Sequence, residues 1–513
     1  MDLSFTLEQL DALSVFSLRD IAREKGHTSP TNKRKGELIE FILDEQAKAQ
    51  KKAEEAVDAP VKKRRGRPPK KSAQQIQDEQ KEEEELKAKK EIEKNETETK
   101  SKPRFDLDGK HQKQQESGDV KDKKIVETQS TEEMEIREGV LELCPDGYGF
   151  LRAKNYEQGE GDAYIPAQKL RKSGLKKGDL VRAYCKKIAE NRPMCVHEII
   201  TVNGDKPESA FNRPTFESLI PIHPDNRFKL ELATSKKDFA IRAIDLVAPI
   251  GKGQRAMIVS PPKAGKTTLL KKIANSISKN YPDAHLMVLL VDERPEEVTE
   301  MQRFIKGEVI SSTFDELPEH HTKASELVLE RAKRLVERGR DVVILLDSIT
   351  RLTRAYNLVI APTGKTLSGG IDPGSLYLPK KFFGAARNIE NGGSLTIIAT
   401  ALVDTGSRMD DVIYEEFKGT GNMEIHLDRR LSEKRIFPAI DLAKSGTRRE
   451  ELLLTEQELV GIFAVRKMLS AGDVQESTEK LMSMMMSTDT NAEFIQMLTI
   501  QLKDLQKKGY NFV

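Results

Sequence analysis

The feature that most constrains this chain is the stretch from Ala256 to Leu270, which has the sequence AMIVSPPKAGKTTLL. A short apolar run precedes a Pro-Pro-Lys-Ala-Gly-Lys-Thr segment and a helix-favouring run, which predicts a strand, a loop and a helix. In such a loop, backbone N–H groups and the positive end of the helix face an anion. Lys266 is then placed to reach the β- and γ-phosphates of a nucleotide, and the Thr267 hydroxyl to bind Mg²⁺.

The spacing G-x-x-x-x-G-K-[ST] is met except at its first position, where Ser260 stands in place of glycine. A small residue still allows the loop to close. The alternative is a Gly-Lys-Thr that merely starts a helix, but the apolar strand directly upstream favours a nucleoside-triphosphate site. The residues expected around the phosphates are Pro262, Lys263, Ala264, Gly265, Lys266, Thr267 and Thr268.

The length and charge of the chain limit its organisation and its partners. A chain of 513 residues is expected to hold about two to four domains. The net charge is only +2, so nucleic-acid binding must come from local patches. Three cysteines without a C-x-x-C pair indicate a reducing cytosol and packing roles, and argue against structural zinc. Without a run of about 18–20 apolar residues or a signal peptide, we expect a cytoplasmic protein with no membrane partner.

The amino-terminal part divides into two segments. Residues 1–46 carry apolar residues at helical spacing and predict a small helical module. Residues 47–132 are dominated by Lys, Glu, Gln and Asp and predict a disordered charged linker. Within the linker, the basic run from Lys62 to Lys70 resembles an AT-hook that could bind DNA in the minor groove. A solubilising basic run is an equally good interpretation.

Residues 133–205 predict a small β-barrel of the OB or cold-shock type, because short β-rich runs are separated by glycines. Tyr148 and Phe150 are two residues apart and therefore share a strand face, which Arg152 continues. An exposed face of this kind is a stacking platform for unpaired bases. If the two rings pointed inward, they would be ordinary core residues. The flanking glycines and Arg152 favour the exposed interpretation.

After a connector over residues 206–235, residues 236–513 alternate strand-like and helix-like runs, which is typical of an α/β domain built from βαβ units. The expected strands are 256–260, 286–292, 309–313, 342–347 and 395–402, and the expected helices between them include 266–278, 295–305 and 324–338. Helical periodicity from Thr455 to Leu505 predicts packing and subunit contact.

Two strand ends in this domain carry acidic residues. Asp347 ends the apolar run from Val342, where an acid at the carboxyl edge of the sheet can hold Mg²⁺. Glu293 ends another apolar strand, where it could polarise the attacking water. The alternative is that Asp292 and Glu293 only favour the positive end of the next helix.

Glycine-rich loops and arginines follow in the second half of the domain. The loops Pro362–Gly370 and Asp404–Arg408 are suited to gripping a polyanion, although they could also be mobile surface loops. Arginines in short turns near Arg435 and Ser445–Arg449 could act as fingers at a neighbouring subunit's triphosphate.

Several long blocks resemble one family. The segments PPKAGKTTLL, VDERPEEVTEMQR, VVILLDSITRLTRAYN, KFFGAARNIENGGSLTIIATALVDTGS, YEEFKGTGNMEIHLDR and EKRIFPAIDLAKSGTRREELL are similar to the Rho family of bacterial transcription termination factors. The resemblance runs from about Arg137 to the carboxyl end, and the amino-terminal helices resemble that family's helical cap. It implies a RecA-like P-loop ATPase domain behind an RNA-binding barrel. It also implies a hexameric RNA-dependent ATPase and translocase that uses ATP and Mg²⁺ and acts on the RNA polymerase transcription complex.

The resemblance also implies roles for individual residues. Lys266 and Thr267 would bind phosphate and Mg²⁺, Asp347 would be the second acid, and Glu293 would orient or deprotonate water. At the nucleotide, Arg448 would be the finger acting between subunits, with Arg435 nearby, Phe437 would stack on adenine, and Arg294 would contribute to binding. Single-stranded RNA or DNA would contact Tyr148, Phe150, Arg152, Asp162 and Tyr164, and RNA would contact Lys365, Thr366 and Arg408 in the central channel.

Two departures and two other functions remain open. The segment Asn191–Cys195 lacks the aromatic residue that is common there in the family, so pyrimidine preference could be altered. The charged segment Ala47–Glu132 is extra to the compact form of the family. The alternatives are a RecA-like ATPase of the rotary-motor type and a nucleic-acid packaging protein that uses the basic linker.

Overall fold

The computed structural model describes residues 134–187, 193–233, 238–469 and 473–507, with only the backbone of 502–507, and single positions between Leu10 and Asp44. The chain separates into two units, Met1–Lys124 and Ile125–Val513. In the first unit, the described residues are helical, and Leu10, Leu18, Leu38, Ile39 and Ile42 form a buried cluster. The predicted helical module 1–46 is described only at these positions and stays a prediction. The predicted linker 47–132 and its basic run lie outside the described residues.

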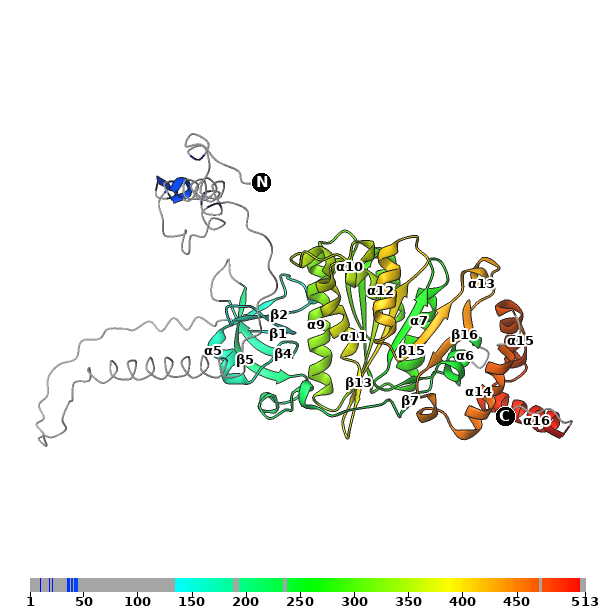
Figure 1. Ribbon diagram of the computed structural model, residues 1–513. Helices are drawn as coiled ribbons and strands as arrows, with labels where there is room; N and C mark the ends of the chain where they lie inside the picture. Colours follow the sequence, from blue (N-terminus) through cyan, green and yellow to red (C-terminus); the bar gives the residue numbers. More distant parts are fainter. Residues whose placement is uncertain are drawn as a thin grey trace, which may run out of the picture. The chain divides into compact units, whose positions relative to one another are not determined.

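The second unit begins with a closed five-stranded barrel of order β1-β2-β3-β5-β4 (Figure 1). The elements are β1 Glu135–Leu143, β2 Gly149–Arg152, β3 Ala163–Ile165, α5 Ala167–Ser173, β4 Leu180–Lys186 and β5 Met194–Val202. Inward-facing Leu141, Leu151, Ala163 and Val181 alternate with outward residues, which is the period of two expected for strands with one buried face. The predicted barrel is therefore confirmed. Cys185 belongs to its core, and all three cysteines are free thiols.

The connector contributes to both sheets of the following domain. It contains η2 Pro207–Ala210, η3 Phe216–Ser218, β6 Pro221–Ile222 and β7 Arg227–Phe228. Strand β6 pairs with β13 (Arg387–Ile389), and β7 pairs with β8 (Ile250–Gly251). The segment predicted as a link is thus partly built into the domain.

The α/β domain is organised around one sheet of order β11-β10-β12-β14-β9-β15-β16. Its strands are β9 Arg255–Ser260, β10 His285–Glu293, β11 Glu308–Thr313, β12 Asp341–Asp347, β14 Ser394–Leu402, β15 Met423–Leu427 and β16 Ile440–Thr447. All neighbours on this path are parallel except β15 and β16. The five predicted strands are present, each within a residue or so of the expected bounds.

Helices cover both faces of this sheet, which explains why its strands are apolar throughout. Along β9, Ala256 and Ile258 pack in one layer while Met257 and Val259 pack in the other. The first layer holds α6 Phe239–Val247, α7 Lys266–Asn280, α8 Pro295–Phe304, α14 Glu456–Leu469, α15 Val474–Met486 and α16 Asn491–Lys507. The second holds α9 Pro318–Val336, α10 Ile349–Val359, α11 Tyr377–Gly384 and α12 Arg408–Lys418 (Figure 1).

Short helices complete the domain: η4 Ser368–Gly370, η5 Pro373–Leu376, α13 Arg429–Glu433 and η6 Glu450–Leu452. Among the described residues, no helix combines the length and the apolarity needed to cross a bilayer.

Candidate functional site

The loop between β9 and α7 has the backbone that an anion site requires. Gly265 precedes the helix with φ of 89°, and Lys263 has φ of 64°. These left-handed residues turn the chain so that the helix starts at Lys266. Ser260 is the buried last residue of β9 and does not adopt a positive φ. The first position of the motif therefore needs no glycine here, which accounts for the departure from the usual spacing.

Three predicted site residues converge beyond this loop. The ammonium group of Lys266 lies 2.6 Å from Asp347 Oδ1 and 3.9 Å from Glu293 Oε2. In the sheet, β14 lies between β9, which leads into the phosphate loop, and β12, which ends at Asp347. Thr400 of β14 spans this gap and donates a hydrogen bond of 2.8 Å to Asp347 Oδ1. Sequence patterns do not reveal Thr400, because its role depends on the strand order.

Glu293 is held in an environment that favours its protonated form. It is 4% exposed at the end of β10. Burial and the nearby Asp347 carboxylate raise its pKa, while Lys266 and Arg351 oppose the shift. A carboxylate with a raised pKa is a stronger base, which suits a group that accepts a proton from water. Arg351 also forms an ion pair of 3.1 Å with Asp292.

The predicted Mg²⁺ ligands lie among further oxygen atoms. The Thr267 hydroxyl lies 3.4 Å from Glu297 Oε2, on the first turn of α8. Mg²⁺ prefers hydroxyl and carboxylate oxygens as ligands. The residues here fit this ion, because such oxygens are offered by Thr267, Asp347, Glu293 and Glu297. Glu297 is absent from the sequence predictions, although the acidic start of α8 is a signal for it. Arg294 is exposed at the N-cap of the same helix.

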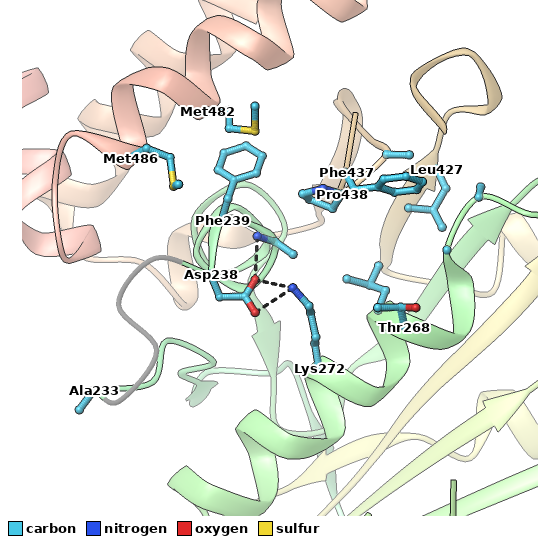
Figure 2. Close-up of a pocket in the computed structure, with 15 residues that line it drawn as sticks. Ala233, Asp238, Phe239, Thr268, Lys272, Leu427, Phe437, Pro438, Met482 and Met486 are labelled. Atoms are coloured by element: carbon cyan, nitrogen blue, oxygen red, sulfur yellow. Dashed lines mark hydrogen bonds and ion pairs between the residues drawn. The ribbon is translucent and has the colours of Figure 1, made fainter. Parts of the chain in front are cut away.

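A cavity of about 1020 Å³ opens beside the loop (Figure 2). Phe437, Leu427 and Pro438 line one side and Met482 and Met486 another, while α7 supplies the floor with Thr268 and Lys272. Lys272 forms an ion pair of 2.9 Å with Asp238, which also caps α6. Phe437 is 50% exposed. Its ring lies close to the phosphate loop, since a Cβ atom added to Gly265 would be 3.9 Å from Phe437 Cε1. A flat base could therefore lie against it.

The two predicted arginines lie at opposite ends of β16. Arg435 is exposed just before this strand, near α13, whose Ser432 hydroxyl donates a hydrogen bond of 3.3 Å to Lys263 O in the phosphate loop. Arg448 follows the strand, beside Met423 and the beginning of β9. The phosphate loop leaves the other end of β9, so Arg448 lies away from Lys266 of its own chain. Within one chain an eight-residue strand separates Arg435 from Arg448, so the expected proximity of the two arginines could arise only between neighbouring chains.

The two glycine-rich loops come together on the domain surface. A side chain on Gly369, whose φ is 78°, would collide with the backbone of Arg408 and Met409 at 2.9 Å and 2.7 Å. Glycine at this position allows the loop 362–370 to lie against the start of α12. Lys365, Thr366 and Arg408 are all exposed. The cations Lys365 and Arg408 and the hydroxyl of Thr366 are therefore accessible from solvent.

The barrel carries an aromatic cluster on its outer face. The ring centroids of Tyr148, Phe150 and Tyr164 lie 5.6–5.9 Å apart, and each ring is partly exposed. Arg152 lies 4.9 Å over Phe150 and pairs with Asp162 at 2.6 Å and with Glu142 at 2.5 Å. Asp162 is 5% exposed and holds this guanidinium in place. The outward orientation is confirmed, and Glu142 is a further member that the sequence predictions lack.

Polar contacts fix the barrel to the α/β domain. Arg213 of the connector forms two hydrogen bonds of 2.5 Å and 2.6 Å with Asp179. Asn203, after β5, accepts a hydrogen bond of 2.5 Å from Arg331 on α9. Tyr156 donates one of 2.5 Å to Glu308 on β11. The barrel therefore contacts the edge strand β11 and helix α9.

Comparisons with known proteins agree with this arrangement. Residues 137–208 match the Rho termination factor RNA-binding domain, and residues 240–447 match the nucleotide-binding domain of the ATP synthase alpha/beta family. The chain is similar to transcription termination factor Rho of Bacillus subtilis strain 168, with 57% identity over 72% of this chain and 87% of that protein. The Rho proteins of Escherichia coli K12 and Haemophilus influenzae Rd are 53% and 54% identical, each over 70% of this chain and 87% of their own length.

Among solved structures, an ATPase from the type III secretion system of pathogenic bacteria matches 55% of this chain and 86% of its own, with 23% identity and a TM-score of 0.46. The family is established by the identity to the Rho proteins and by the match to the Rho RNA-binding domain. This chain belongs to the Rho family of transcription termination factors.

Proposed function

We propose that this chain works as a homohexamer that hydrolyses ATP with Mg²⁺, draws single-stranded RNA through its centre and acts on the RNA polymerase transcription complex. Its family makes it an RNA-binding ATPase of transcription termination. The observation that carries the proposal is the convergence of Lys266, Glu293 and Asp347 at the phosphate loop, in a unit that also presents an aromatic platform.

In the proposed mechanism, Lys266 leaves Asp347 and binds the phosphates when ATP enters. Bound Mg²⁺, held by Thr267 and Asp347, would offset charge on the transferring phosphoryl group. Glu293 accepts the proton of the attacking water. Arg448 reaches the triphosphate of the neighbouring subunit, since it lies away from its own, and Arg435 acts near the phosphate loop that Ser432 of α13 contacts.

RNA is proposed to bind in two places. Its bases stack on Tyr148, Phe150 and Tyr164, with Arg152 and Asp162 shaping the platform. Lys365, Thr366 and Arg408 contact the phosphates of a second stretch of RNA. Because these loops and the phosphate loop belong to one domain, a change at the nucleotide can move the RNA contacts.

The decisive experiment measures ATP hydrolysis with and without single-stranded RNA at a stated salt concentration. Lys266→Ala should abolish RNA-stimulated hydrolysis, whereas Lys279→Ala, at the far end of the same helix, should leave it intact. RNA-stimulated hydrolysis that survives Lys266→Ala would disprove the proposal. The rotary-motor alternative predicts no stimulation by RNA and no effect of Tyr148→Ala.

The basic run in residues 47–132 supports only a secondary proposal, a DNA contact. Deleting these residues should leave RNA binding by the barrel unchanged. A packaging protein that relied on the linker would instead lose nucleic-acid binding.

A further inference from the structure

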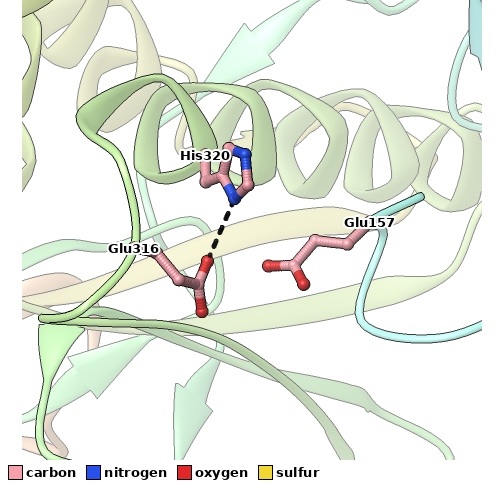
Figure 3. Close-up of side chains that lie close together, drawn as sticks. All are labelled: Glu157, Glu316 and His320. Carbon is pink, nitrogen blue, oxygen red and sulfur yellow. Dashed lines mark ion pairs between the residues drawn. The ribbon is translucent and has the colours of Figure 1, made fainter. Parts of the chain in front are cut away.

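A group of three side chains outside the nucleotide and RNA sites has the composition of a metal site. Glu157, from the loop after β2, faces Glu316 in the turn before α9 and His320 in the first turn of α9 (Figure 3). One ligand atom from each residue lies within 4.8 Å of the others. Two carboxylates and an imidazole are ligands of divalent transition metals, which bind them at about 2.0–2.2 Å. A small movement of the side chains would place all three on one ion.

A proton or a metal ion between the two carboxylates would relieve the repulsion between their charges. Burial and the adjacent Glu316 raise the pKa of Glu157, because two negative charges in close contact repel, while a hydrogen bond from Asn155 and the nearby His320 oppose this shift. Glu157 Oε1 is buried and has no hydrogen-bond partner among the described residues. A buried carboxylate oxygen without a donor costs free energy that a cation would recover. This unpartnered oxygen belongs to the same three-residue cluster, where it is free to bind a cation.

Neighbouring groups already orient Glu316 as a ligand. Its Oε2 accepts a hydrogen bond of 2.8 Å from the Ser312 hydroxyl, and its Oε1 accepts one of 3.0 Å from Thr313 N. Burial opposes ionisation, but these hydrogen bonds lower the pKa of Glu316 and keep it charged. His320 lies 3.4 Å from Glu316 and its side chain is 46% exposed, which leaves a path for an ion from solvent. Hydrogen bonds to a ligating carboxylate are typical of metal sites.

We propose that Glu157, Glu316 and His320 bind a divalent transition-metal ion such as Zn²⁺. The ion would join the RNA-binding barrel to the ATPase domain, because Glu157 belongs to the first and the other two to the second. The turn that carries Glu316 also donates a hydrogen bond of 3.2 Å from Phe314 N to Glu293 O. Metal binding would therefore fix the barrel loop beside the strand end that carries Glu293.

Isothermal titration of the full-length protein with ZnCl₂, in the absence of nucleotide and Mg²⁺, tests this proposal. We expect one ion per chain at this site and an increase in melting temperature, since the ion binds only the folded chain. Glu157→Gln should weaken this binding by about tenfold or more. Glu160→Gln, an exposed change in the same loop, should have no effect.

His320→Ala gives a second test that does not depend on a buried position, with His223→Ala as its matched control. It should weaken Zn²⁺ binding while the controls bind like the original protein. Zn²⁺ binding that is absent, or that is unchanged by both Glu157→Gln and His320→Ala, would overturn the proposal and leave only a shared proton between the carboxylates.

Discussion

Glu293 combines burial with a position beside the phosphate loop, and its raised pKa leads to a prediction about pH. The base must be ionised to accept a proton, so RNA-stimulated kcat/KM should fall as pH decreases through this pKa, above the range of an ordinary glutamate. Glu293→Gln should lower kcat by about 10²- to 10⁴-fold while nucleotide binding persists. The pH profile of ATP hydrolysis and a fluorescent-nucleotide titration measure the two effects. A Gln variant with near-normal turnover would exclude Glu293 as the base.

Single residues differ in how far the sequence could reveal them. Local sequence patterns, a phosphate-loop motif and an apolar strand that ends in an acid, predict the positions of Lys266, Thr267 and Asp347. The outward orientation of Tyr148 and Phe150 follows from the alternation of side chains along a strand. Glu142, Glu297 and Thr400 reach their partners only through the packing of separate elements. No local pattern contains that information, which is why prediction missed them.

At the scale of elements, β14 inserts between the strand that leads to the phosphate loop and the strand that carries Asp347. Its Thr400 hydroxyl is buried and donates to Asp347. Thr400→Val keeps the shape but removes this donor, so we expect a loss of about 1.5 kcal/mol, roughly tenfold in kcat/KM. Steady-state ATPase kinetics measure it. Thr400→Ser, which retains the hydroxyl, should preserve most of the activity, and equal effects of the two changes would contradict this role.

The outer face of β2 and β3 gives a second prediction at this scale. Tyr148→Ala should weaken binding of single-stranded RNA by about 1–3 kcal/mol, because a stacked base loses its aromatic partner. Fluorescence anisotropy with a labelled oligonucleotide measures this loss. Tyr184→Ala, a change of another exposed barrel tyrosine outside the cluster, should bind RNA normally. Equal losses for both variants would indicate damage to the barrel instead.

Elements were predicted well because their signals are local. The apolar run of β12 is long enough to be a strand buried on both faces, and the glycine-separated runs of the barrel alternate with period two. The small strands β6, β8 and β13 were missed, since two- or three-residue strands depend on a partner from elsewhere in the chain. The separation of Arg435 from Arg448 also required the strand β16, which was not predicted.

At the scale of the whole molecule, a buried ion pair joins the connector to the barrel. Asp179 has a fully buried side chain, and Arg213 pairs with it through two short hydrogen bonds. Arg213→Ala should destabilise this unit by about 3–5 kcal/mol, because the buried Asp179 loses its cation and keeps only the neutral donors Asn203 Nδ2 and Lys176 N. Thermal unfolding followed by circular dichroism measures the change. Arg171→Ala, on the exposed side of α5, is the control, and similar melting of the two variants would argue against the predicted cost.

Action between subunits is testable by mixing two inactive variants. If the proposed hexamer forms, mixed hexamers of Arg448→Ala and Lys266→Ala chains would have some interfaces with an intact Arg448 facing an intact Lys266. We expect these mixtures to recover part of the ATPase activity, although each variant alone is inactive. Arg449→Ala, which affects an arginine paired with Glu451 of its own chain, should be active without mixing. No recovery in any mixture would count against action across the interface.

The placement of Lys266 and Arg448 at opposite ends of β9, and so on two sides of the domain, also limits the symmetry that such an assembly can have. A contact between the Lys266 surface of one chain and the Arg448 surface of its neighbour is heterologous, so a two-fold dimer cannot form it. Each added chain leaves one free surface that carries Lys266 and one that carries Arg448. The rotation between neighbouring chains then either closes a ring or produces an open spiral. In the proposed assembly every chain therefore has the same direction, which would give a ring the two distinct faces that one-way movement along RNA requires.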